Sequence, residues 1–265
     1  MRLLLLVLLA LPMCMSAQDR RTPFVWGETH TFRSATLNED RTINVWLPSG
    51  YDTGTTRLPV IYLLDGSANE DFMHVAGLMQ FMSGITGAIK PAIVVGIANV
   101  NRKRDFTLPA IDEENKKIIP QSGGSIAFIN FLQNDLIPYV TTHYRTATST
   151  LIGQSLGGLL ATQVLVERPQ LFDTYIIVSP SLWWNNESLL HSADEGFKAH
   201  TNTQTRVYLA SGGKEPKVMQ QDAATLAKMV KKYRNMQLTY APEPTEDHAT
   251  ILHNCLYHAF GVLYK

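Results

Sequence analysis

The 265-residue sequence contains only two cysteines, Cys14 and Cys255, and no long block of charge of one sign. Lysine and arginine number 23 together, as do aspartate and glutamate, so the formal net charge at pH 7 is zero. Without a basic block, we expect neither a nucleic acid nor an anionic surface as a partner. No cysteine–histidine spacing is typical of a zinc site and no glycine-rich run is typical of a phosphate loop, so we expect no metal and no cofactor.

Long apolar runs are also scarce: one follows Arg2, from Leu3 to Met13, and no later run approaches membrane length. A membrane-spanning helix needs about 20 apolar residues, so this run is too short to span. Its charge, apolar core and following small residues are typical of a secretory signal cut after Ala17. We therefore expect an exported protein, periplasmic or secreted, without stable membrane insertion. A lipid anchor at Cys14 is a less favoured alternative, because the two residues before it are not small.

Removal of residues 1–17 leaves residues 18–265, which are enough for one α/β domain with a proper core. Cys255 would then be the only cysteine, which excludes an intramolecular disulfide. The chain shows no internal repeat and no low-complexity linker. Nothing in the pattern predicts an oligomeric state.

Patterns typical of strands alternate along the chain with patterns typical of helices. Two early segments with period-two alternation, HTFRSATL and RTINVWLP, predict an antiparallel pair. Later apolar runs predict buried strands at 58–65, 92–98, TSTLIG, TYIIVSP, 205–212 and MQLTYAP. Helical patterns lie between them at 71–81, 125–143, 156–167, 220–233 and 251–263. Such alternation predicts a mostly parallel sheet with helices on both faces, whereas residues 99–122 show no clear period and predict a long functional or mobile loop.

Ser155 stands in the pattern Gly-Gln-Ser-Leu-Gly, between a predicted strand and a predicted helix. A nucleophilic serine on a sharp strand–turn–helix connection needs this context, because the turn lifts the hydroxyl above the sheet. The flanking glycines allow close approach of the neighbouring chain, and the helix N-terminus favours a developing negative charge. We interpret Ser155 as a nucleophile rather than as one more residue of a glycine-rich bend.

A serine hydroxyl needs a general base, and in this architecture the acid and then the histidine follow the serine along the chain. His248 lies late in the sequence, in a loop before the final helix, and is the predicted base. Glu215, just past the strand 205–212, is the predicted acid. Asp247 is a less suitable alternative because it adjoins His248, and a site with no acid is also left open.

The proposed chemistry also needs two backbone amides that stabilise an oxyanion. One is expected from Leu156, directly after the nucleophile. The other is expected from the loop after the strand that ends in Leu-Leu-Asp, with Ser67 as the candidate and Gly66 as the alternative. Asp65 is expected to brace this loop rather than to take part in chemistry.

Four stretches together resemble the esterase D-like family of α/β-hydrolases: YLLDG (62–66), NRKRDFT (101–107), GQSLGG and SPSLWWNN (179–186). That family includes siderophore trilactone esterases, feruloyl esterases and S-formylglutathione hydrolases. The resemblance runs in order through nearly all of the chain after the signal. It implies the α/β-hydrolase fold, an acyl-enzyme mechanism with Ser155 and His248, and an oxyanion amide at Ser67. It also suggests Glu215 as the acid, although some trilactone esterases use a Ser–His dyad. The family often has histidine where this sequence has Gln154.

Three further side chains are candidates for substrate binding. Arg102 belongs to a basic stretch that could meet an anionic substrate, whereas Arg104 is expected to pair with Asp105 and pin the loop. Trp183 and Trp184 follow a strand end, where at least one indole is expected to wall a pocket.

The sequence thus predicts an exported, cofactor-free serine esterase that acts on a small-molecule ester. Three more specific substrate hypotheses stay open: a siderophore trilactone, a feruloyl or acetyl ester, and transfer to an acceptor alcohol. A non-catalytic binding protein with a hydrolase shape is the alternative from another class, because fold does not fix function.

Overall fold

The computed structural model describes residues 21–265. The predicted signal sequence and the alternative lipid site at Cys14 lie outside these residues. The described chain forms one eight-stranded sheet in the order β1-β2-β4-β3-β5-β6-β7-β8. Its strands are β1 Glu28–Ser34, β2 Glu39–Trp46, β3 Leu58–Leu63, β4 Ile93–Ile97, β5 Thr146–Gln154, β6 Thr174–Val178, β7 Thr205–Gly212 and β8 Met236–Glu243.

The sheet is antiparallel only at its first edge. β1 pairs with β2, and β2 with β4, in antiparallel register, whereas β4, β3, β5, β6, β7 and β8 run parallel. This confirms the mostly parallel sheet with an antiparallel N-terminal pair. Because parallel strands end at the same edge, the loops after β3, β5, β7 and β8 meet at one end of the molecule.

Successive side chains of the central strands enter two different cores. In β3, Val60 and Tyr62 pack in one cluster while Ile61 and Leu63 pack in the other. These four side chains are almost completely buried. A strand covered on both faces has no solvent side, which explains its continuous apolar sequence.

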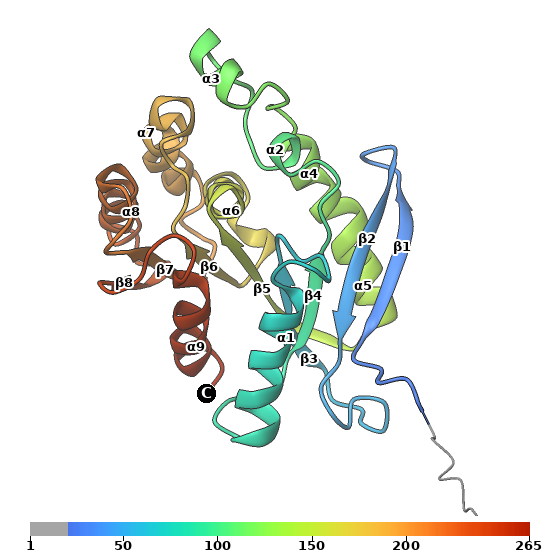
Figure 1. Cartoon of the computed structure of the whole chain (residues 1–265). Helices are drawn as coiled ribbons and strands as arrows, with labels where there is room; N and C mark the ends of the chain where they lie inside the picture. Colours follow the sequence, from blue (N-terminus) through green and yellow to red (C-terminus); the bar gives the residue numbers. More distant parts are fainter. Residues whose placement is uncertain (1–20) are drawn as a thin grey trace, which may run out of the picture.

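Helices cover both faces of the sheet (Figure 1). One face carries α1 Phe72–Gln80, which continues as a π-helical turn, and α9 Ile251–Leu263. The other face carries α4 Ser125–Phe131, α5 Ile137–His143, α6 Leu156–Glu167, α7 Trp184–Ala199 and α8 Lys217–Val230. Helices α6 and α9 have the predicted bounds, and the predicted helix 125–143 is divided by a π-helical turn between α4 and α5. None of the described helices is long and apolar enough to cross a membrane.

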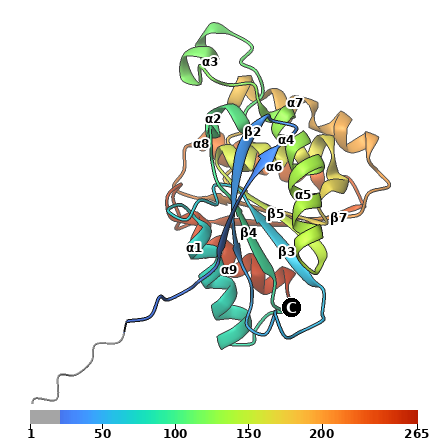
Figure 2. The same ribbon diagram turned by 90° about the vertical axis from the view of Figure 1, so that its right-hand side faces the viewer.

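The segment without periodicity contains two short helices, α2 Arg102–Asp105 and α3 Glu113–Ile118. Each is capped at its N-terminus by a side chain: Asn101 accepts from the Arg104 amide and Asp112 from the Asn115 amide. Helices of four and six residues are too short to show a hydrophobic period, so the sequence pattern missed them. Both views show α3 standing out at the end of the molecule that carries α2 (Figures 1 and 2).

Helix α7 begins at Trp184 with an unusual backbone. Its first turn contains three consecutive left-handed residues, Asn185 to Glu187, with φ between 52° and 61°. Side-chain bonds hold this strained turn, since Asn185 Nδ2 donates to Pro109 O at 2.6 Å and the Ile111 amide donates to Asn185 Oδ1 at 3.2 Å. The turn therefore fastens the loop before α3 to the body of the molecule.

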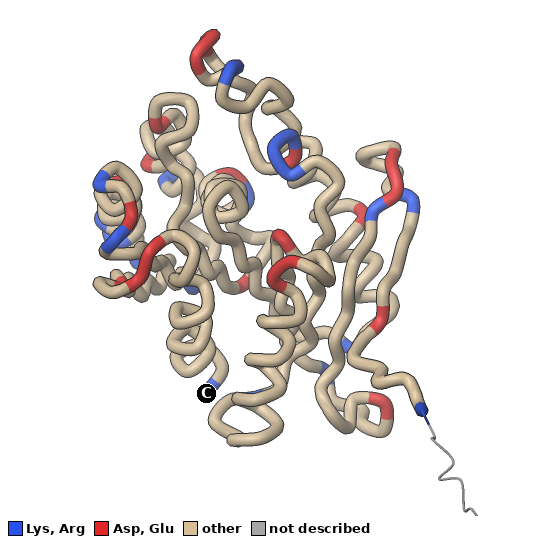
Figure 3. The backbone as a smooth tube through the Cα atoms, in the orientation of Figure 1, with Lys and Arg blue, Asp and Glu red and all other residues tan. Residues whose placement is uncertain are grey.

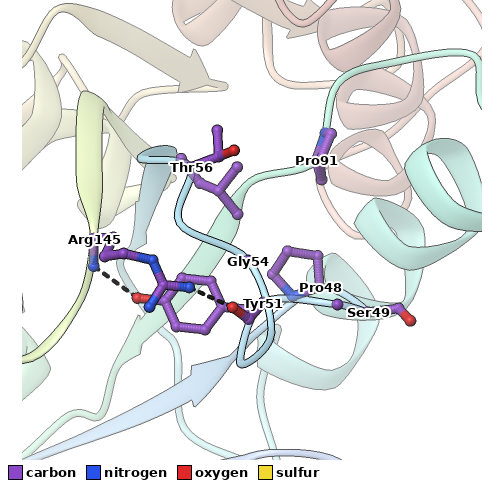
Figure 4. Close-up of a pocket in the computed structure, with 9 residues that line it drawn as sticks. Pro48, Ser49, Tyr51, Gly54, Thr56, Pro91 and Arg145 are labelled. Carbon is purple, nitrogen blue, oxygen red and sulfur yellow. Dashed lines mark hydrogen bonds between the residues drawn. The ribbon is translucent and has the colours of Figure 1, made fainter.

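A pocket of about 120 Å³ lies where β3 and β5 begin (Figure 4). The Arg145 guanidinium lies 4.0 Å from the centre of the Tyr51 ring and donates to the Tyr51 carbonyl, while the Arg145 amide donates to Tyr51 Oη at 2.7 Å. These contacts fasten the loop before β3 to the start of β5. The pocket is at the opposite end of the strands from the predicted nucleophile.

Candidate active site

Ser155 occupies the turn between β5 and α6. Its backbone has φ 59° and ψ −121°, a conformation that costs a non-glycine residue about 1–3 kcal/mol. The neighbouring glycine permits this turn, because a Cβ on Gly153 would lie only 2.2 Å from the Gly157 carbonyl oxygen. The Ser155 amide donates to Val178 O at 3.1 Å, which fixes the turn against β6. The sequence thus maintains a strained serine at the carboxyl end of the central strand.

The Ser155 side chain faces a pocket of about 290 Å³. Its Oγ lies 3.4 Å from Ser181 Oγ, and the Ser181 amide donates to the Ser155 carbonyl at 3.0 Å. The pocket is lined by Asp65, Glu70, Asp71, Arg102, Gln154 and Ser155. Most of these residues are charged, and they come from the loops after β3, β4 and β5.

His248 and Glu215 are brought together from two different loops. Glu215 follows β7, His248 lies between β8 and α9, and His248 Nδ1 is 2.6 Å from Glu215 Oε1. The Gly212 amide donates to the other carboxylate oxygen at 2.8 Å. The Glu215 side chain has no exposed surface, whereas 42% of the His248 side chain is exposed. One imidazole nitrogen is therefore bonded to a buried carboxylate.

The electrostatics of Glu215 favour its charged form. Burial by itself would raise the pKa of this carboxyl. The His248 side chain, the nearby Ser179 hydroxyl and the Gly212 amide outweigh burial and hold the pKa below its ordinary value of 4.5. An ionised Glu215 can accept the Nδ1 proton of His248 and so leave Nε2 free to accept another proton.

Among the described residues, no hydrogen bond joins Ser155 Oγ to His248. The turn that carries Ser155 and the loop that carries His248 are instead connected by Gln154, whose Nε2 donates to the His248 carbonyl at 2.6 Å. Catalytic hydrogen bonds are often long without substrate and tighten when it binds. Sequence reasoning assigned Gln154 no role, since no local pattern relates two residues 94 positions apart.

The two predicted oxyanion amides have different surroundings. Leu156 is the first residue of α6, and the first amides of a helix have no carbonyl acceptor within it. The Ser67 amide donates to Glu70 Oε2 at 3.2 Å. The alternative, the Gly66 amide, donates to Ile97 O at 3.0 Å and so belongs to the pairing of the sheet region.

Arg102 lines the pocket beside Ser155, where its guanidinium is held by Asp65. Arg102 Nε and Nη2 donate to the two Asp65 oxygens at 2.6 and 2.8 Å, and one third of the Arg102 side chain stays exposed. Asp65 also accepts from Asn99 Nδ2 at 2.7 Å, so it braces the loops after β3 and β4. The Arg102 guanidinium is therefore held at the rim of the pocket as one member of an ion pair.

Arg104, by contrast, belongs to a structural ion network. Arg104 Nε lies 2.6 Å from Asp105 Oδ1, and Arg41 Nη1 lies 2.9 Å from the other Asp105 oxygen. Both arginines also reach Glu39. The network pins the start of the long loop to β2, as the sequence suggested for Arg104 and Asp105.

The two tryptophans do not line the pocket beside Ser155. Trp184 is 1% exposed and its Nε1 donates to the Leu108 carbonyl at 3.1 Å, so it braces the long loop. Trp183 is half-buried against the core. Their predicted role in substrate binding stays a prediction.

Acidic residues flank the site on two sides. Figure 3 shows acidic positions on the loop before α1 and on the loop before α9, with basic positions on α2. Burial, reinforced by the neighbouring Asp65 charge, raises the pKa of Asp71 to about 6. Within residues 21–265, no three His, Cys, Asp or Glu side chains form a group that could hold a metal ion.

Comparison with known proteins gives the chain a family. Residues 34–255 match the Esterase family model, described as "Putative esterase". The chain is 32% identical over 199 residues to the ferri-bacillibactin esterase BesA of Bacillus subtilis, an alignment that covers 66% of each protein. It is 36% identical over 193 residues to the siderophore triacetylfusarinine C esterase of Aspergillus fumigatus, covering 66% of this chain and 63% of the relative.

Among solved structures, an IroE-like serine hydrolase from Shewanella oneidensis superimposes with a TM-score of 0.80 at 28% identity. That superposition covers 90% of this chain and 80% of the other. The chain spans about two thirds of the length of the curated relatives it matches. The family match includes the strands and loops that carry Ser155, Glu215 and His248, and the chain belongs to this esterase family of α/β-hydrolases.

Proposed function

We propose that the protein is a serine esterase in which Ser155 is the nucleophile, His248 the general base and Glu215 the acid. The observation that carries this proposal is the meeting of three features at one sheet edge. They are a strained serine at a strand–helix turn, a histidine in the last loop, and a buried carboxylate 2.6 Å from that histidine. A histidine bonded in this way is a suitable base for a serine hydroxyl.

The proposed reaction has two halves. Ser155 Oγ attacks the ester carbonyl carbon while its proton passes to His248 Nε2, and the carbonyl oxygen becomes an oxyanion that accepts from the Leu156 and Ser67 amides. The C–O bond then breaks, and His248 gives the proton to the leaving alcohol. Water attacks the acyl-enzyme with the same base, which releases the carboxylic acid and returns the proton to Ser155.

The proposed substrates are siderophore esters. The relatives named above are esterases of ferri-bacillibactin and of triacetylfusarinine C. The charged pocket supports a polar ester, because its lining offers the Arg102 guanidinium and several carboxylates rather than a deep apolar cavity. Feruloyl or acetyl esters, and transfer to an acceptor alcohol, are outcomes that the test below distinguishes.

Export is part of the same proposal. Residues 1–17 carry the predicted signal, and an exported enzyme would act on a siderophore ester outside the cytoplasm. The mass of the mature N-terminus distinguishes cleavage after Ala17 from lipid attachment at Cys14.

The test is a competition assay that follows product masses. A pool of acetyl, butyryl and feruloyl esters, a catecholate trilactone and a hydroxamate ester is incubated with wild type, Ser155→Ala and the matched control Ser83→Ala. Ser83 lies in the turn after α1 and bonds to Met79 O, away from the pocket. We expect siderophore esters to be opened fastest, by wild type and Ser83→Ala alone. Faster turnover of simple or feruloyl esters would contradict the substrate assignment, and turnover by Ser155→Ala would contradict the mechanism.

A further inference from the structure

One amide that the proposed reaction requires already holds an anionic oxygen. The Ser67 N–H donates to the Glu70 carboxylate at 3.2 Å. An oxyanion and a carboxylate oxygen are the same kind of acceptor, because each concentrates negative charge on oxygen. A single N–H directed at Glu70 cannot at the same time be directed at the ester oxygen.

The neighbouring amide in the same turn is not a substitute. The Gly66 N–H is bonded to the Ile97 carbonyl at 3.0 Å. The Gly66 backbone also packs directly on β4, since a Cβ at Gly66 would lie 2.3 Å from the Gly96 Cα atom. Rotation of this peptide would break a close contact with the sheet, so Ser67 is the donor that the turn can offer.

Glu70 is charged and held where it is. Asn99 Nδ2 donates to both carboxylate oxygens, at 3.1 and 3.2 Å. Burial tends to raise the pKa of Glu70, but the bonds from Ser67 and Asn99 outweigh burial and lower it below the ordinary value. The side chain is ionised at neutral pH and competes with a substrate oxygen as an anion.

Glu70 can also leave this position. The residue is exposed to solvent and lines the same pocket as Ser155. Rotation of its side chain toward water costs hydrogen bonds but no core packing. Ser67 to Glu70 also form a turn, in which the Glu70 amide donates to the Ser67 carbonyl at 2.9 Å while the glutamate side chain reaches back to the Ser67 amide, so the resting contact is locally favourable.

We propose that Glu70 is a gating carboxylate that occupies the Ser67 oxyanion amide in the resting enzyme and must be displaced by the substrate carbonyl. The inference rests on the proposed function, because it assumes that Ser155 attacks an ester beside this amide. When Glu70 is in its resting position, the Ser67 N–H donates to the Glu70 carboxylate. When Glu70 has rotated away, the same N–H donates to the reacting oxygen of the ester. The gate lowers reactivity toward any ester too weakly bound to displace Glu70.

The test compares Glu70→Ala and Glu70→Gln with wild type. A fluorophosphonate probe measures the oxyanion site directly, because Ser155 Oγ bonds to phosphorus, fluoride leaves, the serine proton passes to His248, and the phosphonyl oxygen takes the oxyanion position. Intact-mass measurements give the second-order rate constant of labelling. We expect about a three- to tenfold increase for Glu70→Ala, the factor that one net hydrogen bond supplies, and a smaller increase for Glu70→Gln, whose neutral oxygen competes less well.

Controls separate gating from general loss of charge. Glu167→Gln removes one exposed carboxylate at the far end of α6 and is expected to label like wild type. A lower rate in both Glu70 variants, or a rate unchanged within twofold, would overturn the gate while leaving Ser155 as nucleophile. If wild type and every variant fail to label at Ser155, the proposed function itself is contradicted, and the gate with it.

Discussion

Replacement of Glu215 with glutamine tests the histidine–carboxylate pair with a change of one atom. Glutamine has nearly the same shape, so it fits a site whose side chain has no exposed surface. The acceptor oxygen 2.6 Å from His248 Nδ1 can be replaced by an amide nitrogen that donates. A donor at that place favours the tautomer with hydrogen on Nε2, and this tautomer cannot accept the Ser155 proton.

The expected loss of kcat follows from the interactions that Glu215→Gln removes. The variant loses both the favoured tautomer and the charge that stabilises the imidazolium formed during attack. In serine proteases the equivalent change to a neutral amide lowers kcat about 10⁴-fold, and the partly exposed His248 here has water as a substitute acceptor. We therefore expect a loss of about 10²- to 10⁴-fold in kcat, which corresponds to about 3–5.5 kcal/mol of transition-state stabilisation.

The assay is steady-state hydrolysis of an activated ester by wild type, Glu215→Gln and Glu215→Asp, with thermal unfolding as the control for folding. KM is expected to change little, because the carboxylate contacts the histidine and not the substrate. Retention of more than about a third of wild-type kcat by a folded Glu215→Gln enzyme would refute the three-residue arrangement and favour a Ser–His dyad.

Two further predictions concern the frame of the site. Gln154→Ala removes the bond that holds the His248 backbone, so we expect kcat to fall about tenfold while KM stays within threefold of wild type. Gln154→Glu should lose as much kcat, because an ionised carboxylate has no proton to donate. Unchanged kcat in both variants would contradict this positioning role. Asp105→Asn leaves the buried Arg41 with Glu39 as its remaining carboxylate partner, and should lower the free energy of unfolding in urea by about 3 kcal/mol. A loss below about 1 kcal/mol would show that the network contributes little.

The lowered pKa of Glu215 also predicts how the stability of the fold depends on pH. Because the folded state lowers the pKa of Glu215, its ionised form stabilises the fold above the ordinary value of 4.5. This contribution is lost as the pH falls through the lower, folded-state pKa. Between pH 7 and pH 3, wild type should therefore lose more stability than Glu215→Gln, as measured by urea unfolding. An equal loss in both proteins would contradict the lowered pKa.

The chain order and the strand ends were sufficient to predict much of the fold and the candidate site. Ser155 was recognisable because its glycines stand between a strand pattern and a helix pattern, and the structure has that turn. Glu215 and His248 each follow a parallel strand, and parallel strands deliver such loops to one edge whatever the intervening sequence. Topology therefore implied that the two residues lie at the same edge of the sheet, and the structure supplies the contact between them.

Contacts between distant loops had no local signal. The pairs Asp65–Arg102 and Gln154–His248 join residues from different loops, which only the packed sheet brings together. The Ser-x-x-Glu spacing that ends at Glu70 is visible in the sequence, and a turn brings the two residues together. Its conflict with the oxyanion role of the Ser67 amide is visible only when the pocket geometry is known.

The most direct test of the central claim is detection of an acyl group on Ser155. Wild type is mixed with a slowly hydrolysed ester, quenched in acid within the first turnover, and digested for peptide mass spectrometry, with Ser155→Ala treated in parallel. The account predicts an acyl mass increment on the peptide that contains Ser155 in wild type and none in the variant. Ester hydrolysis by wild type without any acylated Ser155 peptide, or with equal turnover by Ser155→Ala, would contradict it.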